Sequence, residues 1–89
     1  MQLSERYIQT LEKEGFTTAY EQQDPAGTVY PKHSHPGKVS IQVTDGSITY
    51  DLNGEKKEIV AGGRLNIPAN APYSAVVGPT GWIGIIGEE

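Results

Sequence analysis

The sequence predicts an all-β domain, a small barrel or jelly-roll sandwich with one N-terminal α-helix. Eleven glycines and six prolines among 89 residues divide most of the chain into short segments. After Phe16 the apolar residues recur with a period of two, as in the run Val39, Ile41 and Val43. The pair Asn53-Gly54 joins two such segments and is typical of a type I′ hairpin turn. Strands must therefore form most of the domain.

Composition limits the chain to one domain, residues 1–89, because a chain of this length buries only about 60 to 65% of its unfolded surface. The net charge of −4 argues against a nucleic-acid or anionic-lipid partner. The absence of cysteine excludes disulfides and thiolate metal ligands. No apolar run approaches the roughly 20 residues of a membrane span, and the N-terminus lacks a signal-peptide pattern, so a cytoplasmic location is expected.

One helix is expected over residues 4–14. Ser4 is a suitable N-cap, and Leu3 before it can contact Ile8 as a hydrophobic staple. Gly15 follows as the expected left-handed residue at the C-terminal end. The face expected to cover the sheet consists of Tyr7, Ile8 and Leu11. Because the opposite face carries charges of both signs, the helix is interpreted as scaffold.

Eight short strands are expected in the barrel region, residues 16–87. They span 16–22, 28–33, 39–45, 47–52, 55–60, 64–67, 73–77 and 82–86. Turns rich in glycine, proline, asparagine and aspartate separate them. Eight strands of this length predict a closed or nearly closed sheet.

The candidate chemistry begins at His33-Ser34-His35, which contains both histidines of the chain. On an extended segment, side chains two residues apart project from the same face. Two imidazole nitrogens can then converge on one ion. A pair of ligands alone does not define a metal site.

Two runs of sequence resemble the motifs of the cupin family. Residues 33–46 are similar to the first motif, in which two histidines, a later glutamate and a glycine turn occupy one strand pair. Residues 62–73 are similar to the second motif, which opens with glycine, places a proline six residues later and ends in a histidine. The fifteen residues between them are typical of small single-domain cupins. The resemblance covers about residues 24–87 and implies a cupin-type barrel.

The resemblance also implies a candidate metal site. Its four ligand positions fall on His33, His35, Val39 and Tyr73, so the usual glutamate and second-motif histidine are replaced. His33, His35 and Tyr73 with water could hold one divalent ion, Zn, Ni, Fe or Mn. The alternative is a polar pocket without metal, in which the histidines hydrogen-bond Tyr73. The residues expected to line the pocket, or else to fill the barrel, are Tyr30, Val39, Tyr50 and Trp82.

Three functions are compatible with these residues. The first is a small cupin that binds a small-molecule metabolite, with or without a weakly held metal. The second is a cupin enzyme, either an isomerase or epimerase that uses imidazole and phenol as base and acid, or a metal-dependent dioxygenase. The third is a homo-oligomeric interaction module without metal. Cupins often pair through sheet edges, so a homodimer is expected, and no catalytic residue is assigned.

Overall fold

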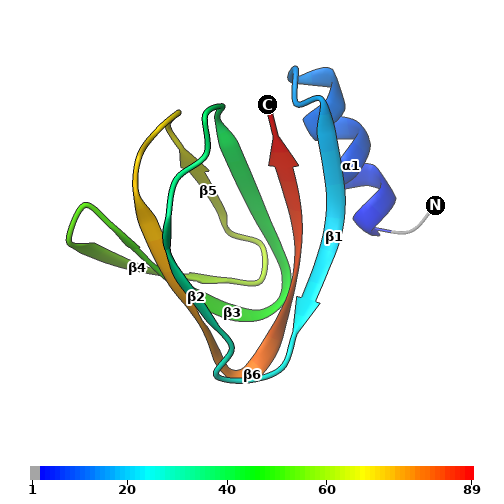
Figure 1. The fold of residues 1–89 in the computed structure, drawn as a ribbon. Helices are drawn as coiled ribbons and strands as arrows, with labels where there is room; N and C mark the ends of the chain where they lie inside the picture. The colour runs from blue at the N-terminus through cyan, green and yellow to red at the C-terminus, as the bar shows by residue number, and fades with distance from the viewer. Residues whose placement is uncertain (1–2) are drawn as a thin grey trace.

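The computed structural model describes residues 3–89, which form one helix followed by six strands (Figure 1). The elements are α1 (Leu3–Lys13), β1 (Thr18–Asp24), β2 (Val29–His33), β3 (Val39–Leu52), β4 (Glu55–Val60), β5 (Arg64–Ile67) and β6 (Tyr73–Glu88). All strand pairs are antiparallel. The one helix in this part of the chain is too short to cross a membrane.

The helix begins at Leu3, one residue before the predicted start. Ser4 therefore lies inside the first turn, and the prediction that it precedes the helix as a cap is wrong by one position. The residue before the helix and the side chain of Leu3, with the predicted staple, lie outside the described residues. The helix ends at Lys13, one residue before the predicted end, and Gly15 has the predicted left-handed conformation with φ 103°. The amides of Gly15 and Phe16 donate to the carbonyls of Glu12 and Leu11, as in a Schellman motif.

Two long strands, β3 and β6, form the centre of the molecule and pair along most of their length. Each also pairs with two shorter strands, one on either side of a bend. On one side of the bend β1, residues 82–88, residues 39–45 and β5 form what we call the helix-side sheet. On the other side β2, residues 73–77, residues 47–52 and β4 form the hairpin-side sheet. These two sheets face each other as a jelly-roll barrel (Figure 1).

The structure has six strands where eight were predicted. The predicted strands 39–45 and 47–52 are one strand, β3, and the predicted strands 73–77 and 82–86 are one strand, β6. The cause is a pair of bulges in β3, on either side of Asp45 and Gly46, that bends the strand without ending its pairing. Gly46 has φ 69°, and a Cβ there would overlap the carbonyl oxygen of Gly81 on β6. The glycines read as turns therefore form the corner where both strands pass from one sheet to the other.

One predicted turn is confirmed, and the predicted start of the first strand is wrong by two residues. Asn53 and Gly54 have φ of 56° and 82°, which confirms the hairpin between β3 and β4. The first strand begins at Thr18 rather than residue 16, because the preceding residues complete the end of the helix.

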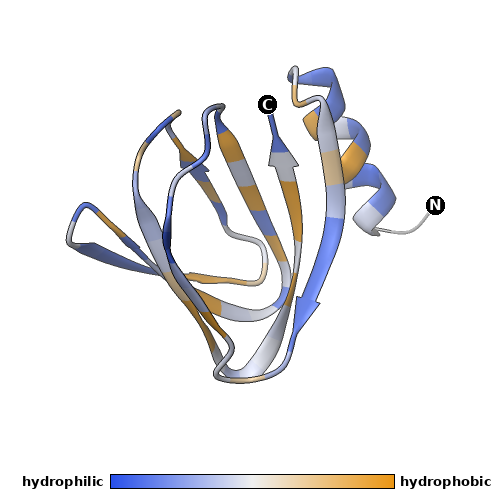
Figure 2. Cartoon of the chain, in the orientation of Figure 1, coloured by the Kyte–Doolittle hydropathy of each residue, from blue (hydrophilic) through white to orange (hydrophobic). Residues whose placement is uncertain are grey.

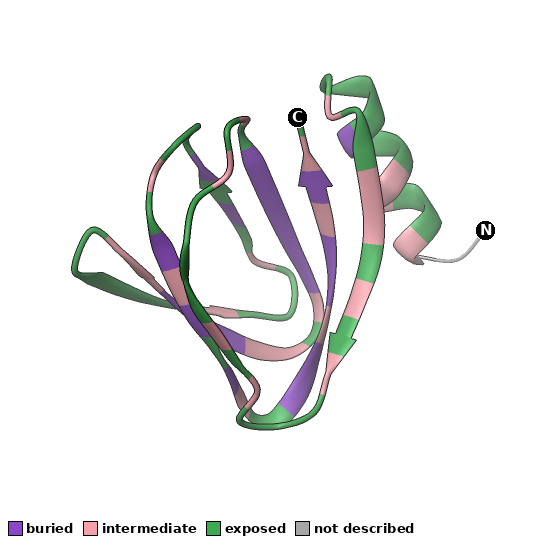
Figure 3. Cartoon of the chain, in the orientation of Figure 1, coloured by how far each residue is buried: buried purple, intermediate pink, exposed green. Residues whose placement is uncertain are grey.

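The main core lies between the two sheets, and buried positions concentrate along β3 and β6 (Figure 3). Apolar bands alternate with polar ones along these strands (Figure 2), as the period of two predicts. A second, smaller core lies under the helix, where Leu11 and Ile85 are buried and Phe16 packs close to Gly87. The helix therefore covers the outer face of the helix-side sheet, as expected for scaffold.

Candidate functional site

A pocket of about 130 Å³ lies between the two sheets and opens near the histidines. Its walls come from β1, β2, β3, β6 and the loop after β2. The lining residues are Tyr20, Tyr30, His33, His35, Val39, Ile41, Tyr50, Tyr73, Trp82, Ile86 and Glu88. The structure thus brings together every residue that the sequence assigned to the metal site or the pocket. Tyr20, Ile41, Ile86 and Glu88 were not among them.

The two histidines lie at the exposed mouth of the pocket. His33 is the last residue of β2, His35 follows in the loop, and their ring centroids are 5.2 Å apart. Nδ1 of His33 is 2.7 Å from the carbonyl oxygen of Pro31. Since a carbonyl only accepts, Nδ1 carries the proton and Nε2 is the free ligand nitrogen. The carbonyl of His35 accepts from the amide of Asn70, which fixes the loop against the segment after β5.

Tyr73 is the centre of the ring contacts at this mouth. Its ring centroid is 4.4 Å from that of His33, 6.1 Å from that of His35 and 5.9 Å from that of Tyr50. Among the described residues no hydrogen bond joins either imidazole to its hydroxyl, so the contact is ring packing. Burial, and then the charge of Glu88, raises the pKa of Tyr73 to about 12. The phenol is therefore neutral at physiological pH.

The opposite end of the pocket is closed by hydrogen bonds to Asp24. Its carboxylate accepts from the hydroxyl of Tyr30, from Nε1 of Trp82 at 2.9 Å and from the amide of Gln22. Burial alone would raise the pKa of Asp24, but these three donors outweigh it and lower the pKa. Burial, followed by the bond to Asp24, raises the pKa of Tyr30 to about 12. The carboxylate at this end of the pocket therefore already has hydrogen-bond partners within the protein.

Glu88 is the functional candidate that sequence reasoning missed. The hydroxyl of Tyr20 donates to its Oε2 at 2.8 Å, and burial followed by this bond raises the pKa of Tyr20 to about 12. Glu88 pairs with Val39 in the sheet register, so a carboxylate lies beside the position where the cupin motif has its own. The alternation along β6 could have indicated it, because every second residue from Trp82 faces inward: Trp82, Gly84, Ile86 and Glu88. The predicted strand ended at residue 86, two residues short of it.

The donor set does not fit a resident divalent metal. Within residues 3–89 no group of three or more histidines, cysteines or carboxylates is placed to hold an ion. The mouth offers two imidazoles and a neutral phenol, while Val39 turns a buried apolar side chain into the pocket. Glu88 lines the same pocket, but its carboxylate accepts from Tyr20 and forms no metal-binding group with the two histidines. Divalent sites in proteins need three or four donors, with carboxylate or thiolate charge for the harder ions.

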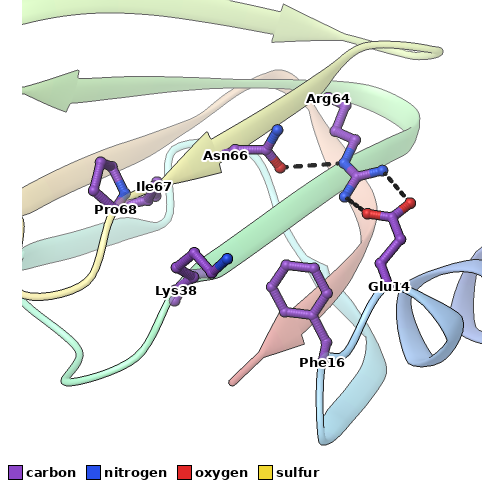
Figure 4. A pocket seen from close by; sticks show the side chains of 8 residues that line it. Glu14, Phe16, Lys38, Arg64, Asn66, Ile67 and Pro68 are labelled. Atoms are coloured by element: carbon purple, nitrogen blue, oxygen red, sulfur yellow. Dashed lines mark hydrogen bonds and ion pairs between the residues drawn. The ribbon is translucent and has the colours of Figure 1, made fainter.

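A larger hollow of about 360 Å³ lies outside the barrel, between the end of the helix and β5 (Figure 4). Arg64 lines this hollow, and both terminal nitrogens of its guanidinium donate to the carboxylate of Glu14, at 2.5 and 3.0 Å. Lys38, also at its wall, lies 3.7 Å from Glu89. The charged groups of this groove are paired with one another, so it has less to offer a ligand than the interior pocket.

Several solved structures have a similar fold. They include an RmlC-like cupin from Shewanella frigidimarina (25% identity, TM-score 0.73), the DMSP lyase DddQ from Ruegeria pomeroyi (21%, 0.74) and KdgF from a Halomonas species (23%, 0.66). Each match covers 80% of this chain and 63%, 36% and 67% of the other chain, respectively. The chain thus spans less than two thirds of the first two. No family model and no curated protein matches it.

Fold and pocket together define a single antiparallel jelly-roll barrel with aromatic residues and histidines around its interior. Together with the structural matches, this gives the chain the fold of a small cupin domain. The resemblance read from the two sequence motifs is confirmed at the level of the fold.

Proposed function

We propose that this cupin domain binds a small metabolite in the pocket between its two sheets. The observation that carries the proposal concerns two tyrosines, Tyr50 and Tyr73. Both line the pocket, both are more than nine-tenths buried, and neither hydroxyl donates to another described residue. No fully enclosed side-chain nitrogen or oxygen among the described residues lacks a hydrogen-bond partner, so these two hydroxyls open into the pocket, where a bound ligand can contact them.

The size and walls of the pocket restrict the ligand. A cavity of about 150 Å³ holds one benzene molecule, so a pocket of about 130 Å³ suits a compact molecule or the head of a longer one. Val39, Ile41 and Ile86 provide apolar walls. Burial raises the pKa of Tyr50 far above that of a free phenol, so its hydroxyl stays protonated and the wall it contributes is uncharged.

NMR titration of the ¹⁵N-labelled protein with benzene-sized fragments of neutral, anionic and cationic type tests the proposal. We expect some fragments to shift the indole N–H of Trp82 and the ring signals of His33. The double variant Tyr50→Phe, Tyr73→Phe should lose these shifts, whereas the control Tyr7→Phe, on the helix, should keep them. Shifts confined to the groove around Arg64, or no shifts at all, would contradict the proposal.

An isomerase or epimerase activity is the second candidate, favoured by the 4.4 Å separation of the His33 and Tyr73 rings. An imidazole and a protonated phenol side by side can act as base and acid. The homodimer and the cytoplasmic location stay predictions, to be tested by sedimentation and by localisation of the tagged chain.

A further inference from the structure

The charge lining the interior pocket is of one sign. Glu88 contributes a carboxylate to the wall, and no lysine or arginine is among the described residues that line it. The hydroxyl of Tyr20 donates to Glu88 without neutralising it. Asp24 adds a second carboxylate behind Tyr30 and Trp82. In a low-dielectric pocket such charge favours a cation and opposes an anion.

The remaining walls are aromatic. Four tyrosines and the one tryptophan of the chain line this pocket, together with both imidazoles. Aromatic faces and phenol oxygens carry partial negative charge and attract cations that have lost their water. The hydroxyls of Tyr20 and Tyr30 already donate hydrogen bonds to carboxylates. Among the four tyrosines, only those of Tyr50 and Tyr73 could therefore donate to an anion.

We propose that the pocket takes the head of a small organic cation, a methylated ammonium group, held by the aromatic rings and by the charge of Glu88. This inference rests on the proposed function and names the class of its ligand. A compact metal ion would need a set of ligand atoms that the described residues do not bring together. A methylated ammonium group has an apolar surface, so Val39 and Ile41 can contact it directly.

The test compares two probes of one shape, choline and its uncharged isostere 3,3-dimethylbutan-1-ol. Both are titrated into the ¹⁵N-labelled protein while the indole N–H of Trp82 is followed. We expect choline to bind about tenfold or more tightly than the neutral alcohol, as a desolvated cation–aromatic contact allows. Equal or tighter binding of the alcohol, or no shift with choline at millimolar concentration, would overturn the inference.

Matched variants separate the charge from the shape of the pocket. Glu88→Gln keeps an acceptor for the hydroxyl of Tyr20 but removes the charge, so choline should bind roughly fivefold more weakly and the alcohol unchanged. Glu89→Gln, the neighbouring residue paired with Lys38 outside the pocket, is the control and should change neither. Equal loss in the two variants would show a general charge effect and overturn the assignment to Glu88.

The two proposals fail in different ways. If neutral or anionic fragments shift the pocket signals and choline does not, the cation inference is wrong and the small-molecule function stands. If no fragment of any charge shifts them, both are wrong.

Discussion

Two polar clusters lie on opposite faces of β3, and they differ in how completely their hydrogen bonds are closed. On the outer face Ser40 is fully buried, its hydroxyl donates to Asn66 at 2.7 Å and it accepts from Nε of Arg64 at 2.7 Å. Glu14 on the helix accepts the other nitrogens of Arg64. On the inner face the hydroxyls of the buried Tyr50 and Tyr73 make no such bonds within residues 3–89.

This contrast separates groups that hold the fold from groups that serve a ligand. A buried polar group costs stability unless it is bonded, and a closed cluster recovers that cost within the protein. The hydroxyls of an open cluster reach the space of the pocket, where water or a ligand can bond them. Substitutions in the outer cluster should therefore change stability and leave binding intact, and substitutions at the inner hydroxyls should do the reverse.

Trp82 is where this separation should fail, because it belongs to both the core and the pocket. It is 3% exposed, and its indole donates to Asp24. Trp82→Ala should lower the free energy of unfolding by about 3–5 kcal/mol, measured by urea denaturation, and abolish fragment binding as well. Trp82→Phe, which keeps most of the packing, should lose less. A loss below about 1 kcal/mol for the alanine variant would mean that the pocket end is not packed as described.

The largest change that can be made to the inner cluster is to restore the missing cupin ligands. In the double variant Val39→Glu, Tyr73→His, a new carboxylate would lie beside Glu88, and burial and repulsion should destabilise the metal-free protein by a few kcal/mol. A divalent ion at 100 times its dissociation constant would return about 2.7 kcal/mol.

Thermal unfolding with chelator and with added zinc measures both effects. The variant should melt below the parent with chelator and gain more than the parent with metal. The parent is the control, and its two imidazoles alone should bind zinc weakly. If metal shifts neither protein, the four positions do not share a centre.

Much of the fold could be predicted, because its signals are local. The period of two, the Asn53-Gly54 turn and the Gly15 helix end each depend on a few neighbouring residues, and each is confirmed. The count of strands was wrong because a glycine that ends a strand and a glycine that bends one look alike in sequence. Only the close approach of Gly46 to β6, set by long-range pairing, distinguishes them.

The site could be predicted only in part, for the same reason. His33, His35 and Tyr73 fall within sequence motifs, so they could be named before their contacts were known. Glu88 and Tyr20 enter the pocket through the pairing of β6 with β3 and β1, which no short motif records. The bonds of Ser40, Arg64 and Glu14 likewise join three elements that are distant in sequence.

Ser40 tests the outer cluster at its most buried point. Ser40→Ala removes both hydrogen bonds of the buried hydroxyl, while Nε of Arg64 keeps its bond to Oδ1 of Asn66 at 3.2 Å, so we expect a loss of about 1–2 kcal/mol in urea denaturation. Ser74→Ala, on the half-buried face of β6, is the control and should stay within about 0.5 kcal/mol of the parent. Fragment binding should be unchanged in both. A Ser40→Ala protein as stable as the parent would show that the outer cluster is not closed by this hydroxyl.

The smallest expected effect concerns pH and the ion pair that anchors the helix. The hydrogen bond from Arg64 lowers the pKa of Glu14 below its ordinary value of 4.5. A carboxyl group whose pKa is lowered by folding adds stability above its unfolded pKa and loses it as the pH falls through the folded one. The pair is exposed, so solvent screens most of this contribution.

The parent should therefore lose more stability than Glu14→Gln when urea denaturation is repeated from pH 7 down through pH 4.5 and below. Asp24 also has a lowered pKa and destabilises both proteins in the same range, so only the difference between the two curves reports Glu14. Glu12→Gln on the same helix serves as the control and should follow the parent. Parallel curves for parent and Glu14→Gln would mean that the ion pair does not hold the helix to the sheet, and that the hydrogen bonds of Ser40 close the outer cluster without it.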